Sequence, residues 1–154
     1  MSFSRKAVLA LTGIAALAMP LAVAGSASAS TDARCTVTPL KPVFDHVNSS
    51  GEKVIKYETK VTCSAGRSIE ILDERRDHDN LSTDDFEGSN TYNLRFDSTE
   101  TVTKYVLAVL PDADGWGDNN EEMYHSVGFQ VTEDNGYVSQ WTNWEDSAIV
   151  TFHL

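Results

Sequence analysis

The amino-acid sequence predicts an all-β protein, an antiparallel β-sandwich of about seven strands. The clearest evidence is the strict alternation over residues 53–63, where apolar side chains fall on one face and mainly charged or hydroxyl side chains on the other. Similar short runs recur at regular spacing, separated by Gly, Pro, Asn and Asp, which favour turns. After residue 29, no stretch carries the period of an amphipathic helix of useful length.

The expected strands are short and follow one another closely along the chain. They lie at 35–38, 53–63, 67–74, 92–96, 101–110, 123–131 and 148–154. Asp-Asn-Gly at 134–136 is a strong hairpin signal. We interpret 73–88 as an acidic loop, and we expect 101–110, which is rich in Val, Thr and Tyr, to be a deeply buried strand.

Residues 1–29 are interpreted as a cleavable secretory leader. A basic pair precedes the uncharged residues 7–25, and an Ala-x-Ala pattern ends at Ala29, where we expect cleavage. The competing interpretation is a retained transmembrane anchor, because about 20 apolar residues span a bilayer. Pro20 and the small polar residues near the end of this segment favour cleavage. The alanine-rich leader is typical of a bacterial protein, and the expected location is extracellular.

Residues 30–154 then form one strongly acidic domain. The chain has 12 Lys and Arg against 23 Asp and Glu, and the leader removes two basic residues and no acidic ones, which leaves a net charge of −13. Such a domain repels nucleic acids and anionic membranes, so we expect neither as a partner. Positively charged partners and divalent cations are compatible with this charge. The alternative interpretation is that the negative charge serves only to keep an exported protein soluble.

Two cysteines remain in the domain, Cys35 and Cys63. An even number of cysteines in an exported chain predicts a disulfide. The bond would tie the start of the first expected strand to the end of the second, and closing this loop contributes about 3–4 kcal/mol by the chain-entropy estimate.

The last third of the chain resembles a known family. Residues 124–131 form an alternating strand that begins near a Tyr, Asn135-Gly136 forms a turn, and 139–142 reads Ser-Gln-Trp-Thr. This arrangement resembles the penultimate strand and following turn of a fibronectin type III or related immunoglobulin-like domain. Residues 141–145 also resemble the Trp-Ser-x-Trp-Ser box of cytokine-receptor domains, with Thr and Glu replacing the serines. The resemblance implies an immunoglobulin-like sandwich and transfers no function.

Catalytic patterns are weak in this sequence. No Gly-x-Ser-x-Gly element is present. The histidines are scattered, at His46, His78, His125 and His153. Asp84 and Asp85 would serve a glycosidase-like site only if they converged with partners at a cleft. We therefore predict that the protein is not an enzyme.

A calcium site is the better chemical hypothesis, although acidic loops are usually only solvated. The candidate ligands are Asp112, Asp114, Asp118, Glu121 and Glu122. The segment begins like a calcium loop but has Trp116 at its fifth position and Met123 at its twelfth. A second acidic cluster comprises 77–79 and 84–85. We expect no other cofactor.

The tryptophans are the remaining candidates for ligand binding: Trp116, Trp141 and Trp144. Exposed aromatic rings on a rigid sandwich suit sugars or protein partners. The alternative for Trp141 and Trp144 is packing at the edge of the core and against the last strand. The sequence thus favours a secreted, non-catalytic binding module for a glycan or protein. The alternatives are a small enzyme inhibitor and a hydrolase of wall polymers.

Overall fold

The computed structural model describes residues 29–79, 83–111 and 120–154. Within these ranges the chain forms strands and connecting segments, with no helix. The strands are β1 (Ser30–Asp32), β2 (Cys35–Pro39), β3 (Val43–Val47), β4 (Lys53–Cys63), β5 (Arg67–Asp77), β6 (Asp85–Phe96), β7 (Glu100–Val109), β8 (Asn120–Glu133), β9 (Glu145–Asp146) and β10 (Val150–His153). The predicted antiparallel β-sandwich is confirmed. The described strands outnumber those predicted because β1, β3 and β9 are short segments without a marked pattern.

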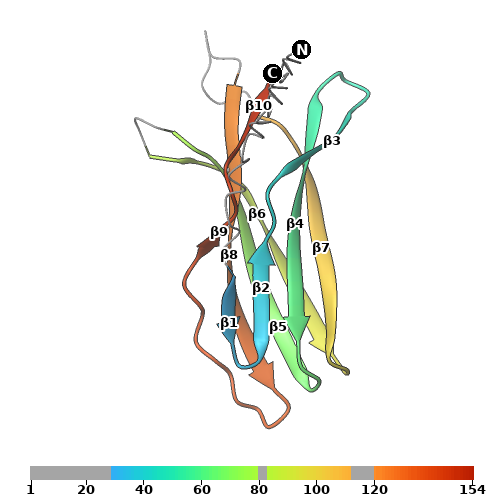
Figure 1. The fold of residues 1–154 in the computed structure, drawn as a ribbon, viewed down its shortest axis with the longest axis vertical. Helices are drawn as coiled ribbons and strands as arrows, with labels where there is room; N and C mark the ends of the chain where they lie inside the picture. The colour runs from blue at the N-terminus through green and yellow to red at the C-terminus, as the bar shows by residue number, and fades with distance from the viewer. Residues whose placement is uncertain (1–28, 80–82, 112–119) are drawn as a thin grey trace, which may run out of the picture.

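Two antiparallel sheets face each other (Figure 1). We call the first sheet the β4 sheet. In it, β7 pairs along one edge of β4, and β2 and β3 pair with different parts of the other edge. β1 pairs with β2 on the side away from β4. In the second, the β5 sheet, β5 lies between β6 and β8. The outer edge of β8 is covered by β10 near one end and by β9 farther along.

The space between the sheets holds two apolar clusters. The larger comprises Cys35, Val37, Val61, Cys63, Ile69, Ile71, Phe96, Val127, Phe129 and Val131. The smaller comprises Ile55, Tyr57, Leu110 and Met123. Alternate residues of a strand face the same side, so the inward row of β4 is buried throughout from Ile55 to Cys63, as the alternation predicts.

The predicted disulfide is confirmed. Cys35 and Cys63 stand directly opposite each other on β2 and β4, and both are fully buried. The bond joins the beginning of β2 to the end of β4, as predicted. A disulfide of this kind indicates an oxidising compartment.

Two expectations from the sequence are wrong. The segment 73–88, expected to be a loop, is largely strand, because β5 continues to Asp77 and β6 begins at Asp85. The segment 101–110, expected to be deeply buried, is mostly the edge strand β7, whose Tyr105 and Leu107 are 60% and 42% exposed. Apolar side chains occur both in the row that faces the core and in the row that faces solvent, so composition alone does not show that one face is exposed.

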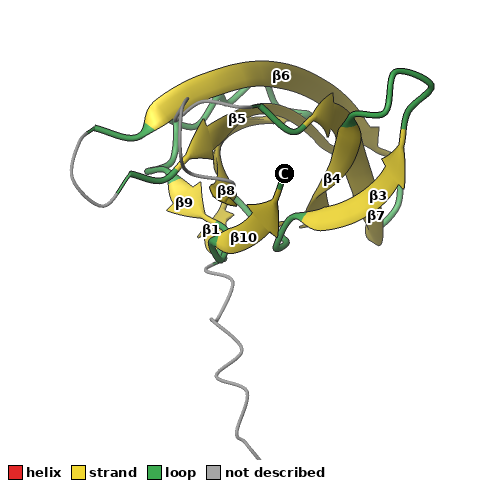
Figure 2. Cartoon of the chain, turned by 90° about the horizontal axis from the view of Figure 1, so that it is seen from above, coloured by secondary structure: helices red, strands yellow, loops and turns green. Residues whose placement is uncertain are grey.

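Figure 2 looks onto one end of the sandwich, where β10 lies next to β3. Lys53 Nζ donates to the carbonyl oxygen of His153 at this end, which links the two sheets. Among the described residues, no helix is long and apolar enough to span a membrane. The predicted leader lies outside the described residues, apart from Ala29.

Candidate functional site

A groove of about 500 Å³ lies between β1 and the chain that returns along β8 after the turn at 134–136. In Figure 1 this returning chain, drawn in orange to red, leads from the end of β8 to β9. The groove is lined by Ser30, Thr31, Asp32, Tyr137, Ser139, Gln140, Trp141, Thr142, Asn143 and Glu145. Trp141, one of the predicted ligand-binding residues, therefore faces a concave surface.

Hydrogen bonds to β8 hold the chain on both sides of Trp141. The backbone amide of Ser139 donates to a carbonyl of β8 at 2.8 Å, and the amide of Thr142 donates to the Phe129 carbonyl at 2.9 Å. Thr142 Oγ1 also accepts from the Phe129 amide at 3.1 Å, and Gln130 Nε2 donates to the Ser139 carbonyl at 2.9 Å. Trp141 is 47% exposed. A well-anchored backbone thus presents a half-exposed ring, which lowers the entropic cost of binding.

Tyr137 supplies a second aromatic ring on the same wall and is 57% exposed. Its amide donates to Asn135 Oδ1 at 2.8 Å, and its carbonyl accepts from the Glu133 amide at 2.8 Å. Gly136 has a φ of 85°, which glycine adopts without steric cost. The turn predicted at 134–136 is present, and it places Tyr137 in the groove.

The opposite wall is β1, which a two-residue turn connects to β2. Ala33 and Arg34 have φ values of 44° and 64°, in a left-handed region that costs non-glycine residues about 1–2 kcal/mol each. Arg67 Nε donates to the Ala33 carbonyl at 3.2 Å, and the Ser64 amide donates to the Arg34 carbonyl at 3.2 Å. Neighbouring groups therefore enforce this conformation and hold β1 in place.

Arg67 connects the two walls of the groove. Besides its bond to the β1–β2 turn, its Nη2 lies 3.1 Å from Glu133 Oε1, at the end of β8 where the returning chain begins. The Arg67 side chain is only 14% exposed, and shielding from water strengthens such ion pairs. This residue therefore helps to fix the spacing between β1 and the returning chain.

The lining is rich in hydrogen-bonding groups. Apart from Tyr137 and Trp141, each lining side chain carries a hydroxyl, amide or carboxylate group, and none is aliphatic. Asp32 and Glu145 form no hydrogen bond or ion pair with another described side chain. Hydroxyl and amide groups both donate and accept hydrogen bonds. The groove can thus stack a flat ligand against aromatic rings and bind polar groups along its edges.

Trp144 lies outside the groove. Carbon atoms of its indole ring are 3.7–3.8 Å from the position that a Cβ on Gly128 would occupy, so the ring covers the glycine on the outer face of β8. Trp144 is still 48% exposed. The two tryptophans that the sequence groups together therefore have different surroundings.

The predicted calcium site falls mostly outside the described residues. Those outside are Asp112, Asp114 and Asp118, together with the candidate Trp116. Glu121 and Glu122 are neighbours on β8, so their side chains point to opposite faces and do not converge. In the part of the chain that the structure describes, no three acidic, histidine or cysteine side chains form a group that could hold a metal ion.

The second acidic cluster is engaged in its own hydrogen bonds. Tyr124 Oη donates to Asp84 Oδ2 at 2.5 Å, and His78 Nδ1 lies 3.1 Å from Asp84 Oδ1. The bond from Tyr124 is the main cause that lowers the pKa of Asp84, whereas burial, together with this bond, raises the pKa of Tyr124. Asp84 thus anchors the β5–β6 connection to β8, and its exposed neighbour Asp85 takes no part in these bonds.

A buried polar pair between the two apolar clusters was missed by sequence reasoning. His125 and Asp73 are both fully buried, with His125 Nδ1 2.8 Å from Asp73 Oδ1. Thr59 Oγ1 donates to Asp73 Oδ2 at 2.8 Å, and His125 Nε2 lies 2.8 Å from the Leu40 carbonyl oxygen. Because a carbonyl oxygen only accepts, Nε2 carries a hydrogen. His125 and Asp73 are 52 positions apart, so no local pattern reveals the pair.

This pair resembles part of a hydrolytic triad, but it has no access to a substrate. The carbonyl of Leu40 occupies Nε2, the atom that would act as general base. Tyr57 also packs against the buried imidazole in an edge-to-face arrangement, with ring centroids 5.6 Å apart. The pair instead links β4, β5, β8 and the β2–β3 connection in a hydrogen-bonded network.

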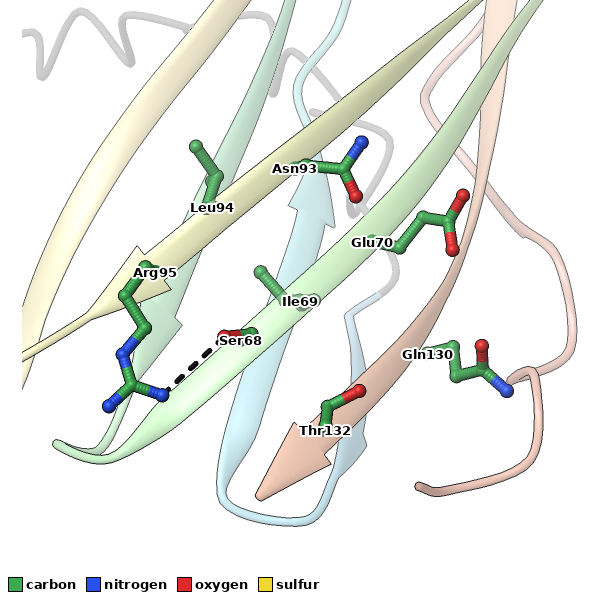
Figure 3. A pocket seen from close by; sticks show the side chains of 8 residues that line it. All are labelled: Ser68, Ile69, Glu70, Asn93, Leu94, Arg95, Gln130 and Thr132. Atoms are coloured by element: carbon green, nitrogen blue, oxygen red, sulfur yellow. Dashed lines mark hydrogen bonds between the residues drawn. The ribbon is translucent and has the colours of Figure 1, made fainter. Parts of the chain in front are cut away.

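A second hollow, of about 290 Å³, lies on the outer face of the β5 sheet (Figure 3). It contains no aromatic ring, and its one basic side chain, Arg95, pairs with Asp97 and Asp134 at 3.1 and 2.6 Å. Gln130 points from this hollow towards the returning chain, whose Ser139 carbonyl it binds. Gln130 thus helps to hold the returning chain that forms one wall of the groove. Without an aromatic ring or an unpaired basic side chain in its lining, this hollow is the weaker candidate for a binding site.

No protein-family model matches the chain, and no curated protein matches it. The groove beside β1 is therefore the basis for a functional assignment.

Proposed function

We propose that this protein is a secreted, non-catalytic module that binds saccharide chains in the groove between β1 and residues 137–145. The main supporting observation is that Trp141 and Tyr137 are half-exposed among hydroxyl and amide side chains. Sugar rings have C–H faces that stack on aromatic rings, and their hydroxyl edges need donors and acceptors. The groove offers both.

The same lining disfavours a protein partner. Protein interfaces are centred on well-packed, desolvated pockets that receive apolar or aromatic side chains. The groove has no aliphatic side chain among its lining residues. A hydroxyl-rich ligand satisfies such a surface better than a peptide would.

The predicted leader supports a location where polysaccharides are available. Cleavage after Ala29 would leave Ser30, a lining residue of the groove, as the first residue of the chain. The disulfide between Cys35 and Cys63 agrees with export to an oxidising compartment.

Binding without catalysis is supported by the state of the two histidine–carboxylate groups described above. The buried His125–Asp73 pair has no open nitrogen for a substrate. The carboxylate of Asp84 already accepts hydrogen bonds from Tyr124 and the backbone. Neither group lines the groove.

The test is calorimetric titration of the protein with a panel of soluble polysaccharides. We expect at least one to bind, and we expect Trp141→Ala to weaken its binding by about tenfold or more. Trp141→Phe, which retains a ring, should lose much less. Tyr105→Ala is the matched control, because Tyr105 is 60% exposed on β7 and does not line the groove.

Two results would refute the proposal. One is that no polysaccharide in the panel binds. The other is that Trp141→Ala and Tyr105→Ala bind as tightly as the unchanged protein, since the ligand would then lie elsewhere.

A further inference from the structure

We infer that the saccharide bound in the groove is positively charged, namely a chain of amino sugars whose amines are not acylated. This inference rests on the proposed function, because it names the class of saccharide that the groove takes. It is carried by two carboxylates without partners in the groove wall, and by the lack of a basic side chain among the lining residues.

The two carboxylates stand on opposite walls. Asp32 is the last residue of β1, and Glu145 is the first residue of β9. Both side chains line the groove and are half-buried, and neither bonds to another described side chain. A partly desolvated carboxylate gains from a charged donor, and a protonated amine forms such a charge-assisted hydrogen bond.

No basic side chain of the lining competes for these carboxylates. The nearby Arg67 is already paired with Glu133 and with the Ala33 carbonyl. The predicted cleavage would add the α-amino group of Ser30, which is one positive charge beside two negative ones. The groove therefore stays negative in the mature protein.

The surrounding charge extends this preference. Residues 64–99 and 110–154, which include the strands of the β5 sheet, carry 18 acidic and 4 basic side chains, against 5 acidic and 6 basic in the rest of the domain. No Lys or Arg follows Lys104, so the returning chain that forms one wall contains none. A field of one sign concentrates counter-ions at low ionic strength.

The aromatic rings act in the same direction. The faces of Trp and Tyr attract a cation placed within about 6 Å of the ring. Trp141 and Tyr137 can therefore stack a sugar ring and also favour its ammonium group. An acetylated amine is neutral and loses both this attraction and the ionic bonds to Asp32 and Glu145.

The experiment compares glucosamine oligomers with N-acetylglucosamine oligomers of equal length, by calorimetry in mildly acidic buffer. The protein is produced from its full-length sequence in a secreting host and purified. We expect the glucosamine oligomer to bind about tenfold more tightly, and we expect this preference to shrink as salt rises from about 0.05 M to about 0.5 M.

The double variant Asp32→Asn with Glu145→Gln should abolish the preference and retain the weaker binding of the acetylated oligomer. The matched control is Glu70→Gln with Glu100→Gln, which removes two exposed carboxylates away from the groove and should keep the preference.

Equal affinity for the two oligomers, or a preference that persists in the Asp32 and Glu145 variant, would overturn the inference and leave saccharide binding intact. Binding of neither oligomer, nor of any polysaccharide in the panel, would overturn both. Oligolysine that competes with the glucosamine oligomer, and binds Trp141→Ala as tightly as the unchanged protein, would show that charge alone is recognised and would overturn the amino-sugar assignment.

Discussion

At the scale of single residues, the buried His125–Asp73 pair has the largest consequence for stability. A polar group without solvent contact is stable only when its hydrogen bonds are complete. Both ring nitrogens and both carboxylate oxygens have partners here. Removal of one member would leave the remaining groups buried and unsatisfied.

We therefore expect Asp73→Ala to lower the free energy of unfolding by about 3–5 kcal/mol, measured by urea denaturation. Glu70→Ala changes an exposed carboxylate on the same strand and should shift stability by no more than about 0.5 kcal/mol. A loss below about 1 kcal/mol for Asp73→Ala would show that the network contributes little.

The Tyr124–Asp84 bond predicts a dependence on pH. This bond lowers the pKa of Asp84 in the folded protein, so it stabilises the fold above the unfolded-state pKa, and the contribution is lost as pH falls through the folded-state pKa. Tyr124→Phe should raise the pKa of Asp84 in an NMR titration. It should also cost about 1 kcal/mol near neutral pH and less in acid. An unchanged pKa of Asp84 in this variant would contradict the assignment, and Tyr105→Phe serves as the control.

The sequence identified individual binding-site residues only where a residue departs from the alternating pattern of the strands. Trp141 was identified because it is a large aromatic residue in a segment without strand alternation, and it lines the groove. Tyr137 was missed because a tyrosine beside a hairpin turn is unremarkable. Asp73 falls where the expected strand 67–74 overlaps the expected acidic loop, and nothing local shows that its partner is His125 on a distant strand.

At the scale of elements, the position of β1 decides whether the groove exists. β1 has three residues and pairs only with β2. Such a short strand gains little from its own ladder of hydrogen bonds. Its place therefore depends on the turn at Ala33 and Arg34, and on the contact of that turn with Arg67.

We expect Arg67→Ala to speed amide hydrogen exchange in β1 and at its partners in β2, and to lower saccharide affinity while Trp141 stays in place. The loss of stability should be about 1–3 kcal/mol, because a partly buried charged group loses its bonds. Arg95→Ala provides the comparison: its ion pairs are more exposed and screened by solvent, so its loss of stability should be clearly smaller than that of Arg67→Ala. Unchanged exchange in β1 after Arg67→Ala would refute the bridging role.

The disulfide is a second determinant at this scale. Replacing both Cys35 and Cys63 by serine should lower the free energy of unfolding by about 3–4 kcal/mol, because the unfolded chain regains the entropy of an open loop of 28 residues. Urea denaturation of the variant and of the unchanged protein gives the comparison directly. A smaller loss, below about 1 kcal/mol, would mean that strand pairing alone already fixes β2 against β4.

Elements with one wet and one buried face were predicted well. β4 agrees with its predicted range of 53–63 because its two faces differ sharply in composition. β5 extends into the predicted acidic loop because Asp77 faces inward there, against the usual pattern, and β6 already begins within it at Asp85. β9 has two residues, too few for any period to show.

At the scale of the whole molecule, acidic and basic side chains are distributed unequally between the two sheets. The β5 sheet and its connections carry most of the acidic residues, and the β4 sheet carries all the lysines of the domain outside position 41. The groove lies where β1 of the first sheet meets the chain that returns along the second. Composition predicted the acidity, but only the fold shows which side of the molecule holds it.

The most direct measurement is an NMR titration of the isotope-labelled protein with a saccharide from the panel, following the backbone amides. We expect the shifts to be confined to Thr31, Asp32, residues 137–145 and their immediate neighbours on β8. Shifts centred instead on the outer face of β7 or on the β5–β6 connection, or no shifts with any saccharide, would contradict the assignment of the groove as a saccharide-binding site.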